Sequence, residues 1–180
     1  AFYKGKSVGL YGTCGAFSFD FFKMTTAGEG GLFITNDEET YKKADTFSDH
    51  GHSHVGDNRG MEPHPYLGFN YRLGELNAAV GLAQMRKINT LRDGKRKNKK
   101  IIKDKLRGID GLTFRHLTDE EGDSATFLNF FLPTIELTQK AVEALAEAGV
   151  GGIAYWYTNM YHFINQWEHV KEMKSAAPLA

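Results

Sequence analysis

The chain has 180 residues, and its 22 lysine and arginine residues balance 22 aspartate and glutamate residues, so the formal net charge is zero. A neutral chain has no overall field that would draw it to nucleic acid or to an anionic membrane, so any basic surface must be local. A single cysteine, Cys14, rules out an internal disulfide and an all-cysteine metal site, which suits a reducing, cytoplasmic compartment. The sequence has no signal-peptide pattern or long apolar run and does not begin with methionine, and we expect it to be an internal or C-terminal fragment.

Residues 1–15 predict a short strand and a turn, and the glycine-rich stretch at 15–36 then places Lys23 between two expected strands. The phenylalanines that alternate with smaller or polar residues in the first of these strands are Phe17, Phe19 and Phe21. A lysine among aromatic side chains at a strand end would be partly desolvated, which favours the neutral amine that a Schiff base requires. The alternative is a solvated surface lysine in an ordinary hairpin turn.

Asn36 begins a predicted helix that ends near Ser48, because its side chain can cap exposed amides and three carboxylates follow it at the positive end of the helix dipole. Residues 49–68 lack apolar periodicity and carry many titratable side chains, so they predict a long functional loop. Helical spacing resumes at Leu73, and the basic run at 92–105 continues it as a long or broken helix between two modules. We interpret the basic run as a solvated helix face, with a nucleic-acid contact as the alternative.

The remaining residues predict a small α+β module. Short strands are expected at 112–114 and 125–132, a helix at about 138–148, and a final strand near 153–157. The tail is dense in aromatic side chains, which we expect to serve packing or an interface before a ligand site.

The loop at 49–68 contains an alternating set of histidines. His50, His52 and His54 would share one face of an extended segment, with His64 nearby, and three imidazoles can bind zinc or copper. Adjacent glycines loosen the backbone and no helical histidine pair fixes the geometry, so we expect no metal site. The favoured role is as hydrogen-bonding groups toward a polar ligand.

Asn70 and Arg72 form a second polar cluster just before a predicted helix. An amide and a guanidinium at a helix N-terminus can bind phosphate or carboxylate, and the equal alternative is a capping region with an exposed arginine. The sequence has no phosphate-binding P-loop motif, dinucleotide fingerprint or nucleophile elbow, so nucleotide hydrolysis and serine hydrolase chemistry lose support.

Two motifs, in this order, resemble the DegT/DnrJ/EryC1/StrS sugar aminotransferase family, whose members are pyridoxal-phosphate enzymes of fold type I. They are Phe-Ser-Phe-x-x-x-Lys-x-x-x-x-Gly-Glu-Gly-Gly at 17–31 and Gly-Phe-Asn-Tyr-Arg-Leu-x-Glu-Leu-Asn-Ala-Ala-Val-Gly at 68–81. The resemblance implies an α/β fold with the second half of the large cofactor-binding domain at 1–86, a connecting helix at 87–108 and an incomplete small α+β domain at 109–180.

The resemblance also implies roles for particular residues. Lys23 would form the Schiff base with pyridoxal 5'-phosphate and later shuttle a proton, and Ser18 would hydrogen-bond the cofactor phosphate. Asn70 matches an asparagine that reaches the phosphate of the neighbouring subunit's cofactor, which implies a homodimer with shared active sites. His52 and Arg72 would face the sugar substrate.

The implied reaction transfers an amino group from glutamate to a keto or aldehydo sugar. The family's glycine- and threonine-containing phosphate loop, ring-stacking aromatic residue and pyridinium-pairing aspartate have no match in this sequence. Without that aspartate the cofactor ring is a poor electron sink, so these 180 residues alone are expected to be inactive. Two alternatives remain: a deoxysugar dehydratase of the same fold, which resembles this family with histidine in place of the lysine, and a non-catalytic, histidine-rich binding or assembly module.

Overall fold

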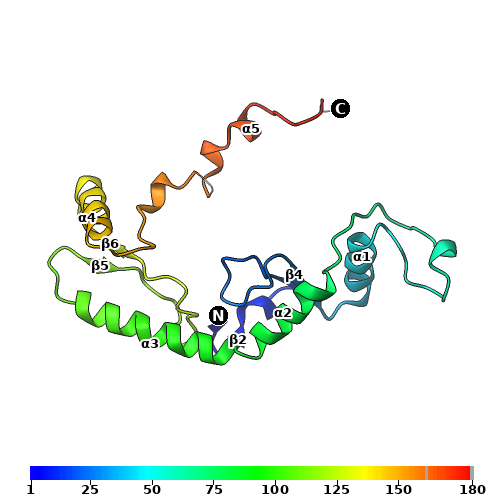
Figure 1. Ribbon diagram of the computed structural model, residues 1–180, viewed down its shortest axis with the longest axis horizontal. Helices are drawn as coiled ribbons and strands as arrows, with labels where there is room; N and C mark the ends of the chain where they lie inside the picture. The colour runs from blue at the N-terminus through cyan, green and yellow to red at the C-terminus, as the bar shows by residue number, and fades with distance from the viewer. Residues whose placement is uncertain (161, 179–180) are drawn as a thin grey trace. The chain divides into compact units, whose positions relative to one another are not determined.

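The structure is a computed structural model that describes residues 1–160 and 162–178. The chain divides into two compact units, one formed by residues 1–105 with 116–128 and the other by 106–115 with 129–180 (Figure 1). Within the described residues, no helix combines the length and the apolar character that crossing a membrane requires.

The first unit contains two antiparallel strand pairs and three helices, which include α3, the longest helix of the described residues. Its strands are β1 (Phe2–Tyr3), β2 (Lys6–Ser7), β3 (Cys14–Ser18) and β4 (Gly31–Thr35). Its helices are α1 (Glu38–Ser48), α2 (Glu75–Met85) and α3 (Ile88–Leu106, whose last residue falls in the second unit), with 3₁₀ turns at Val8–Leu10 and Arg59–Met61. The expected helix after Leu73 is therefore broken, at residues 86–87, and the broken form of the prediction is confirmed.

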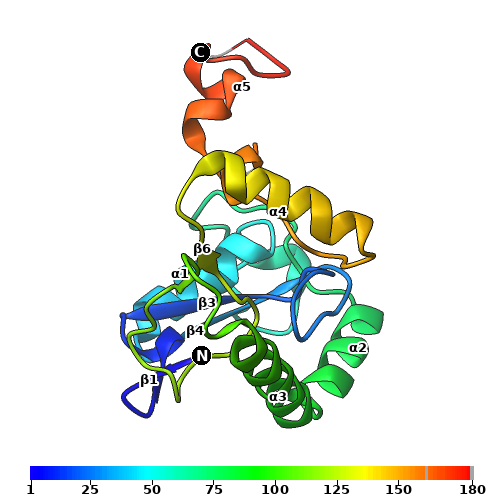
Figure 2. The ribbon, with the colours of Figure 1, turned by 90° about the vertical axis from the view of Figure 1, so that its left-hand side faces the viewer.

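The β3–β4 hairpin carries the Lys23 stretch at one end (Figure 2). Its register runs from the Cys14–Thr35 pair to the Ser18–Gly31 pair. β3 stops at Ser18, so the prediction that the strand continues through Phe19 and Phe21 is wrong. The cause is Asp20, whose carboxylate accepts the Phe22 amide at 3.1 Å and turns the chain out of the extended conformation.

Helix α1 follows β4 and ends at Ser48 as predicted. Its N-cap is Asp37 and not Asn36, because the Asp37 carboxylate accepts the Thr40 amide at 2.7 Å. A carboxylate at this position both satisfies an otherwise unpaired amide and interacts favourably with the helix dipole, which explains why it is preferred to the preceding amide.

Helix α3 carries the basic run, and part of that run binds the chain itself. Arg96 donates to the Asp123 carbonyl at 2.8 Å, Lys99 pairs with the Asp123 carboxylate at 2.6 Å, and Lys103 pairs with Glu120 at 2.8 Å. These contacts fasten residues 119–123 to the helix, which gives the run a structural role within the first unit.

The second unit pairs β5 (Thr113–Phe114) with β6 (Phe130–Phe131) and continues with α4 (Ile135–Glu147), two 3₁₀ turns (Trp156–Thr158 and Ile164–Gln166) and α5 (Glu168–Lys171). The strand predicted near 153–157 is wrong, because Thr158 closes a tight turn on the Tyr155 carbonyl through both its amide and its hydroxyl. The aromatic tail packs on itself, with Trp156 stacked on His162 at 4.8 Å between ring centroids.

Candidate active site

Lys23 lies in the turn that follows β3. Its amide donates to the Asp20 carbonyl at 2.9 Å, while the Asp20 amide donates to the Ser18 hydroxyl oxygen at 3.2 Å. These local bonds fold residues 18–23 into a compact turn that projects the lysine side chain outward. The expectation of a partly desolvated lysine is wrong for this chain, because Lys23 is exposed and its neighbours Phe21 and Phe22 are themselves 60% and 80% exposed.

The chain returns to β4 through a second, tightly packed part of this loop. The Ala27 amide donates to the Phe19 carbonyl and the Phe19 amide donates to the Gly30 carbonyl, both at 2.8 Å. Gly30 has a φ of +137°, and a Cβ there would lie 2.6 Å from Cδ1 of Leu73. Only glycine fits this position, since it needs both the unusual backbone angle and the close approach of the segment before α2.

Asn77 joins helix α2 to the Lys23 loop and was not singled out from the sequence. Its side-chain amide donates to the Ala27 carbonyl at 2.7 Å, and Ala27 is only 3% exposed. One turn further along α2, a Cβ on Gly81 would lie at contact distance, 3.5 Å, from the Ala27 Cβ. An asparagine inside a helix, where its propensity is poor, followed four residues later by a glycine is the signal that would have indicated this packing site.

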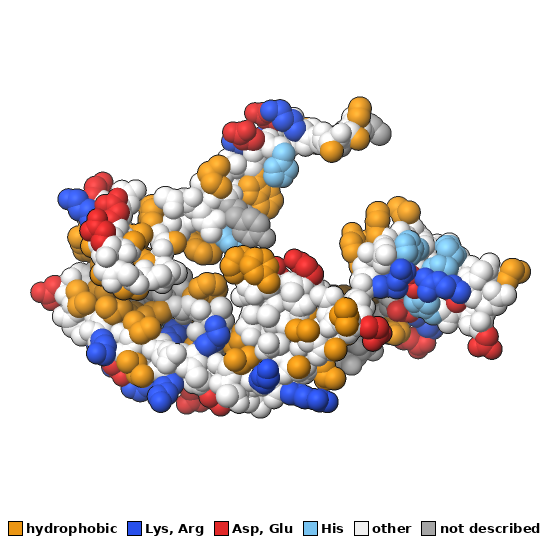
Figure 3. All heavy atoms as spheres, in the orientation of Figure 1, with side chains coloured by type: hydrophobic (Ala, Val, Ile, Leu, Met, Phe, Trp, Pro, Cys, Tyr) orange, Lys and Arg blue, Asp and Glu red, His pale blue; other side chains and the backbone are white. Residues whose placement is uncertain are grey.

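The histidine loop, which we define as residues 49–72, is organised by Asp49. The Asp49 side chain is 6% exposed and accepts hydrogen bonds from Arg59 at 2.7 Å, from Arg72, and from His54 at 3.0 Å. His50 Nδ1 lies 3.2 Å from the same carboxylate. Figure 3 shows histidine and basic side chains, in pale blue and blue, gathered on one part of the surface.

These contacts shift two pKa values. The hydrogen bond from His54, followed by those from Arg72 and Arg59, holds the pKa of Asp49 well below its usual range, against the opposing effect of burial. Hydrogen bonds to Asp45 and then to Asp49 raise the pKa of His54. Because His54 uses both ring nitrogens, at 2.6 Å to Asp45 and 3.0 Å to Asp49, the protonated ring is the form that satisfies both carboxylates.

His52 has a different environment from the other histidines of the loop. Its ring is 14% exposed, lies 4.2 Å from the His64 ring between centroids, and places Nδ1 3.2 Å from the Glu62 carboxylate in an orientation that makes no hydrogen bond. Among residues 1–160 and 162–178, no group of three or more histidine, cysteine or acidic side chains has the arrangement of a metal site.

The sequence-predicted site residues fall into two groups. Ser18 and Lys23 lie on the turn after β3, and His52, Asn70 and Arg72 lie in the histidine loop. No hydrogen bond or ion pair within the described part of the chain joins one group to the other. Arg72 is 45% exposed with Asp49 as its partner, and Asn70 is exposed in backbone pairing with Asp49.

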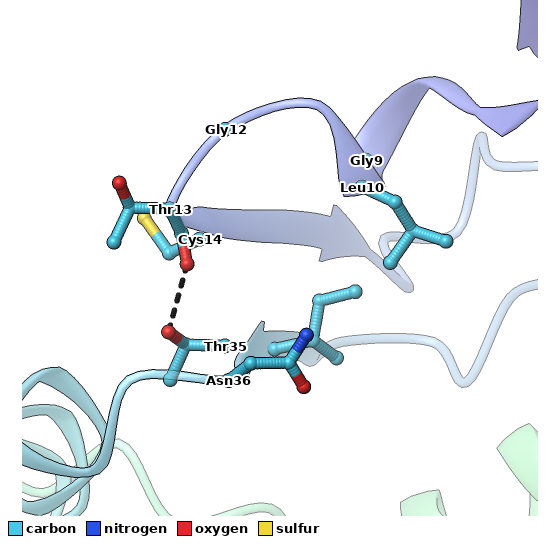
Figure 4. Close-up of a pocket in the computed structure, with 8 residues that line it drawn as sticks. Gly9, Leu10, Gly12, Thr13, Cys14, Thr35 and Asn36 are labelled. Atoms are coloured by element: carbon cyan, nitrogen blue, oxygen red, sulfur yellow. Dashed lines mark hydrogen bonds between the residues drawn. The ribbon is translucent and has the colours of Figure 1, made fainter.

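A small pocket lies at the other end of the hairpin, where Cys14 pairs with Thr35 (Figure 4). It is lined by Gly9, Leu10, Gly12, Thr13, Cys14, Ile34, Thr35 and Asn36. The Thr35 hydroxyl donates to the Thr13 carbonyl at its edge, at 2.8 Å. None of the predicted site residues lines this pocket, because β3 separates it from the Lys23 turn.

Solved structures define the class of fold. The Helicobacter pylori aminotransferase PseC aligns with 98% of this chain and 46% of its own length, at a TM-score of 0.74 and 26% identity. The Escherichia coli GDP-4-keto-6-deoxy-D-mannose-3-dehydratase with bound hydrated PLP aligns with 83% of this chain and 42% of its own, at a TM-score of 0.72 and 26% identity. The chain therefore has an α/β fold shared with sugar-modifying enzymes, and the predicted fold class is confirmed.

The sequence comparison gives the family. The profile of the DegT/DnrJ/EryC1/StrS aminotransferase family matches residues 1–180, and the GDP-perosamine synthase of Vibrio cholerae is 27% identical over 183 aligned residues, covering 98% of this chain and 46% of that protein. The chain belongs to the DegT/DnrJ/EryC1/StrS aminotransferase family, as its motifs predicted. It spans less than half of the length of each of these three proteins.

Proposed function

We propose that this chain provides the lysine-bearing part of a pyridoxal-phosphate-dependent sugar aminotransferase. The observation that supports this most is Lys23, whose side chain is exposed and makes no hydrogen bond or ion pair within the described residues. The loop that carries it is fixed at Ala27 and Gly30. An accessible amine on an anchored loop can reach an aldehyde carbon without competing first with a carboxylate partner.

The side chains of this chain fit the proposed cofactor. When bound, pyridoxal 5'-phosphate supplies a reactive aldehyde and an electron sink. Lys23 would hold the cofactor and, after release by the amino donor, carry a proton on Nζ at the substrate carbon. The Ser18 hydroxyl, at the end of β3, would donate to the phosphate, and the exposed Asn70 amide would donate to the phosphate in a neighbouring subunit.

For the substrates we propose a keto or aldehydo sugar and glutamate. The runs at 47–54, 59–65, 121–125 and 155–157 most resemble those of the 8-amino-3,8-dideoxy-manno-octulosonate transaminase. We therefore favour 8-oxo-3,8-dideoxy-octulosonate, used in lipopolysaccharide sugar synthesis in the cytoplasm. The Arg72 guanidinium is suited to a carboxylate of either the sugar acid or glutamate, and the half-buried His52 would contact the sugar.

The proposed assembly is a homodimer in which each site takes Lys23 from one chain and Asn70 from the other. The absence of a hydrogen bond or ion pair between the two groups of predicted residues, within the described part of one chain, is compatible with this arrangement. For the complete enzyme we propose a large domain that includes residues 1–86, a connecting helix at 87–108 and a small domain that begins at 109.

The same-fold dehydratase is the second candidate, because the Escherichia coli dehydratase is a structural neighbour at a TM-score of 0.72. That branch resembles this chain with a histidine where Lys23 stands, so the presence of Lys23 favours amino transfer. A non-catalytic, histidine-rich module is the third candidate and would require no reaction at Lys23.

Borohydride reduction tests the proposal in the protein as its gene encodes it. After incubation with pyridoxal 5'-phosphate and reduction, peptide mass analysis should place one cofactor adduct on Lys23 and none in Lys23→Ala. The control variant Lys97→Ala, at an exposed position of α3, should retain the Lys23 adduct. An unmodified Lys23 in the saturated wild-type protein would overturn the aminotransferase proposal.

A further inference from the structure

Asp49 is the most heavily contacted carboxylate of the described residues, and neither the family resemblance nor the predicted site assigns it a role. Its Oδ1 accepts from both Arg59 and Arg72, and its Oδ2 accepts from His54. The side chain is 6% exposed, whereas Arg59 and Arg72 are 55% and 45% exposed. A buried carboxylate thus holds two guanidinium groups that face solvent.

The backbone around Asp49 closes the histidine loop. Asp49 pairs with Asn70 in an isolated antiparallel bridge. The Phe69 amide donates to the Phe47 carbonyl at 2.8 Å, and the Tyr71 amide donates to the Ser48 carbonyl at 2.9 Å. The chain leaves α1 and returns to the same place, so the two ends of the loop lie against each other at Asp49.

The close contact between these two ends leaves no room for a side chain. A Cβ on Gly68 would lie 2.3 Å from the Gly51 nitrogen and 2.8 Å from the His50 carbonyl carbon. The position of Asn70, two residues after Gly68, is therefore set by the same packing that holds Asp49. The Asp49 carboxylate also offsets the electrostatic repulsion between the guanidinium groups of Arg59 and Arg72, which would otherwise repel each other at this distance.

Each guanidinium group has five N–H donors and gives only one of its nitrogens to Asp49. Nη1 of Arg72 also lies 3.0 Å from Nδ1 of His50, so the Arg72 donors without a partner in the described residues are those on Nε and Nη2. The bonds to Asp49 and His50 fix the plane of this guanidinium group. A structural ion pair would need no such exposure of both cations. The Asp49 carboxylate thus fixes the Arg72 guanidinium group at the solvent-exposed surface, while Asn70 is held by the adjacent backbone pairing.

We propose that Asp49 is the positioning residue of the histidine loop, which fixes Arg72 for the substrate carboxylate and Asn70 for the cofactor phosphate. The proposal rests on the proposed aminotransferase function, and Asp49 itself touches neither ligand. Its loss would leave Lys23 and its loop intact and weaken the two binding interactions.

The test compares Asp49→Asn with Asp57→Asn in the protein as its gene encodes it. Asp57 is an exposed aspartate of the same loop and serves as the matched control. In Asp49→Asn, saturating pyridoxal 5'-phosphate should still label Lys23 after reduction. The Kd for pyridoxal 5'-phosphate and the KM for glutamate should each rise by about tenfold, the effect of one charged hydrogen bond, with a smaller change in kcat. Asp57→Asn should stay within about twofold of wild type.

Amide hydrogen exchange provides a readout that is independent of activity. Exchange at Phe69 and Tyr71 should be faster by about tenfold in Asp49→Asn, while exchange at Ala27 stays unchanged. Asp49→Glu keeps the charge and should recover part of both effects, and it replaces Asp49→Asn as the test if circular dichroism shows that the asparagine variant is unfolded.

The outcomes separate the two proposals. A labelled wild-type Lys23 with unchanged Kd and KM in Asp49→Asn overturns the positioning role and leaves the aminotransferase proposal intact. Faster exchange with unchanged Kd and KM also overturns it, because Asp49 would then be structural only. An unlabelled wild-type Lys23 overturns the proposed function and, with it, this inference.

Discussion

The Lys23 loop and the histidine loop are held in opposite ways. The Lys23 loop is fixed by neutral backbone bonds, by glycines and by the Asn77 amide on the buried Ala27 carbonyl. The histidine loop is closed by a tight backbone contact and oriented by charges that converge on Asp49. Neutral contacts respond little to pH and salt, whereas charged groups respond to both, so the two halves of the proposed site should differ in their sensitivity to solution conditions.

The largest effect on stability is expected from Gly68→Ala, which should open the histidine loop and leave the Lys23 loop unchanged. Gly68→Ala forces a methyl group to within 2.3 Å of the Gly51 nitrogen, a backbone atom that no side-chain rotation can move aside. We expect local opening of residues 47–71 to become easier by roughly 2–4 kcal/mol. Amide hydrogen exchange at Phe69 and Tyr71 measures this opening.

Gly60→Ala is the matched control, since a Cβ there would have only an ordinary contact, 3.4 Å, with the Asn58 side chain. Exchange at Phe69 should be close to wild type in this control. Equal exchange in the two variants would show that the loop closes without the close approach at Gly68.

A smaller effect is expected at the Lys23 loop. Asn77→Ala leaves the buried Ala27 carbonyl without its side-chain donor, a change that costs about 1–3 kcal/mol. Thermal unfolding and exchange at the Ala27 amide should both report the loss. Asn98→Ala, at an exposed position of α3, should be close to neutral.

Asn77→Ala also tests whether the two loops are held independently. Exchange in the histidine loop should change less than exchange at Ala27, because the Asn77 bond does not involve Asp49. Faster amide exchange in the histidine loop of Asn77→Ala, with unchanged exchange at the Ala27 amide, would contradict the assignment of Asn77 to the Lys23 loop.

The mildest perturbation is a change of pH. The pKa of Asp49 is lowered from 3.8, so its contribution is fully present above pH 3.8 and is lost only as pH falls through the lower folded-state value. The pKa of His54 is raised from 6.5, so its contribution is fully present below pH 6.5 and is lost as pH rises through the higher folded-state value. Both contributions are fully present between pH 3.8 and pH 6.5, so the histidine loop should be best ordered in this range.

Protection factors, corrected for intrinsic exchange, measure this window. Protection at Tyr71 should fall as the pH rises above the folded-state pKa of His54, while protection at Ala27 stays constant. In His54→Gln the alkaline decline at Tyr71 should disappear. A wild-type protection profile without an alkaline decline at Tyr71 would contradict a stabilising role for the protonated ring.

Shared sites give a further test of the comparison, because the two loops would act in different chains. At a pyridoxal 5'-phosphate concentration well below the Kd of the Asn70→Ala variant, Lys23→Ala and Asn70→Ala should each show little activity alone. Mixed at equal amounts and allowed to exchange subunits, they should recover about one quarter of wild-type activity, since half of the dimers are mixed and each mixed dimer has one intact site. No recovery would argue that Lys23 and Asn70 serve one site within a single chain.

Local signals in the sequence were sufficient for much of the first unit. Capping side chains placed the start of α1 within one residue of its N-cap, the loss of periodicity indicated the loop after it, and the motif around Lys23 indicated the family. The extent of β3 was misjudged because alternation continues past Ser18, whereas an aspartate side chain ends the strand. An aspartate turn of this kind can end β3 at Ser18 because the paired strand β4 begins at Gly31, and the sequence does not reveal this register.

The candidate site was predictable in part. The histidines were noticed by their alternation, but the carboxylate that joins them to Arg59 and Arg72 was not, because contacts across 10 and 23 residues have no period. Asn77 was missed for the same reason, since its partner lies 50 residues earlier. A local pattern can mark such a packing position, as the asparagine and the glycine of α2 do, but the partner in a long-range polar pair is decided by the folded backbone.

The segment from Asn70 to Asn77 is secured at both ends, by the Asp49 bridge at one and by the Ala27 carbonyl at the other. Only six residues lie between the two attachments, so the segment can absorb little displacement before one of the attachments must break. A movement of the Lys23 loop that pulls on Asn77 would therefore reach Asn70 in the same chain. In the proposed dimer this chain's Asn70 serves the neighbouring site. Cofactor binding at one site would then restrict the motion of the Asn70 that contributes to the other site, through residues 70–77.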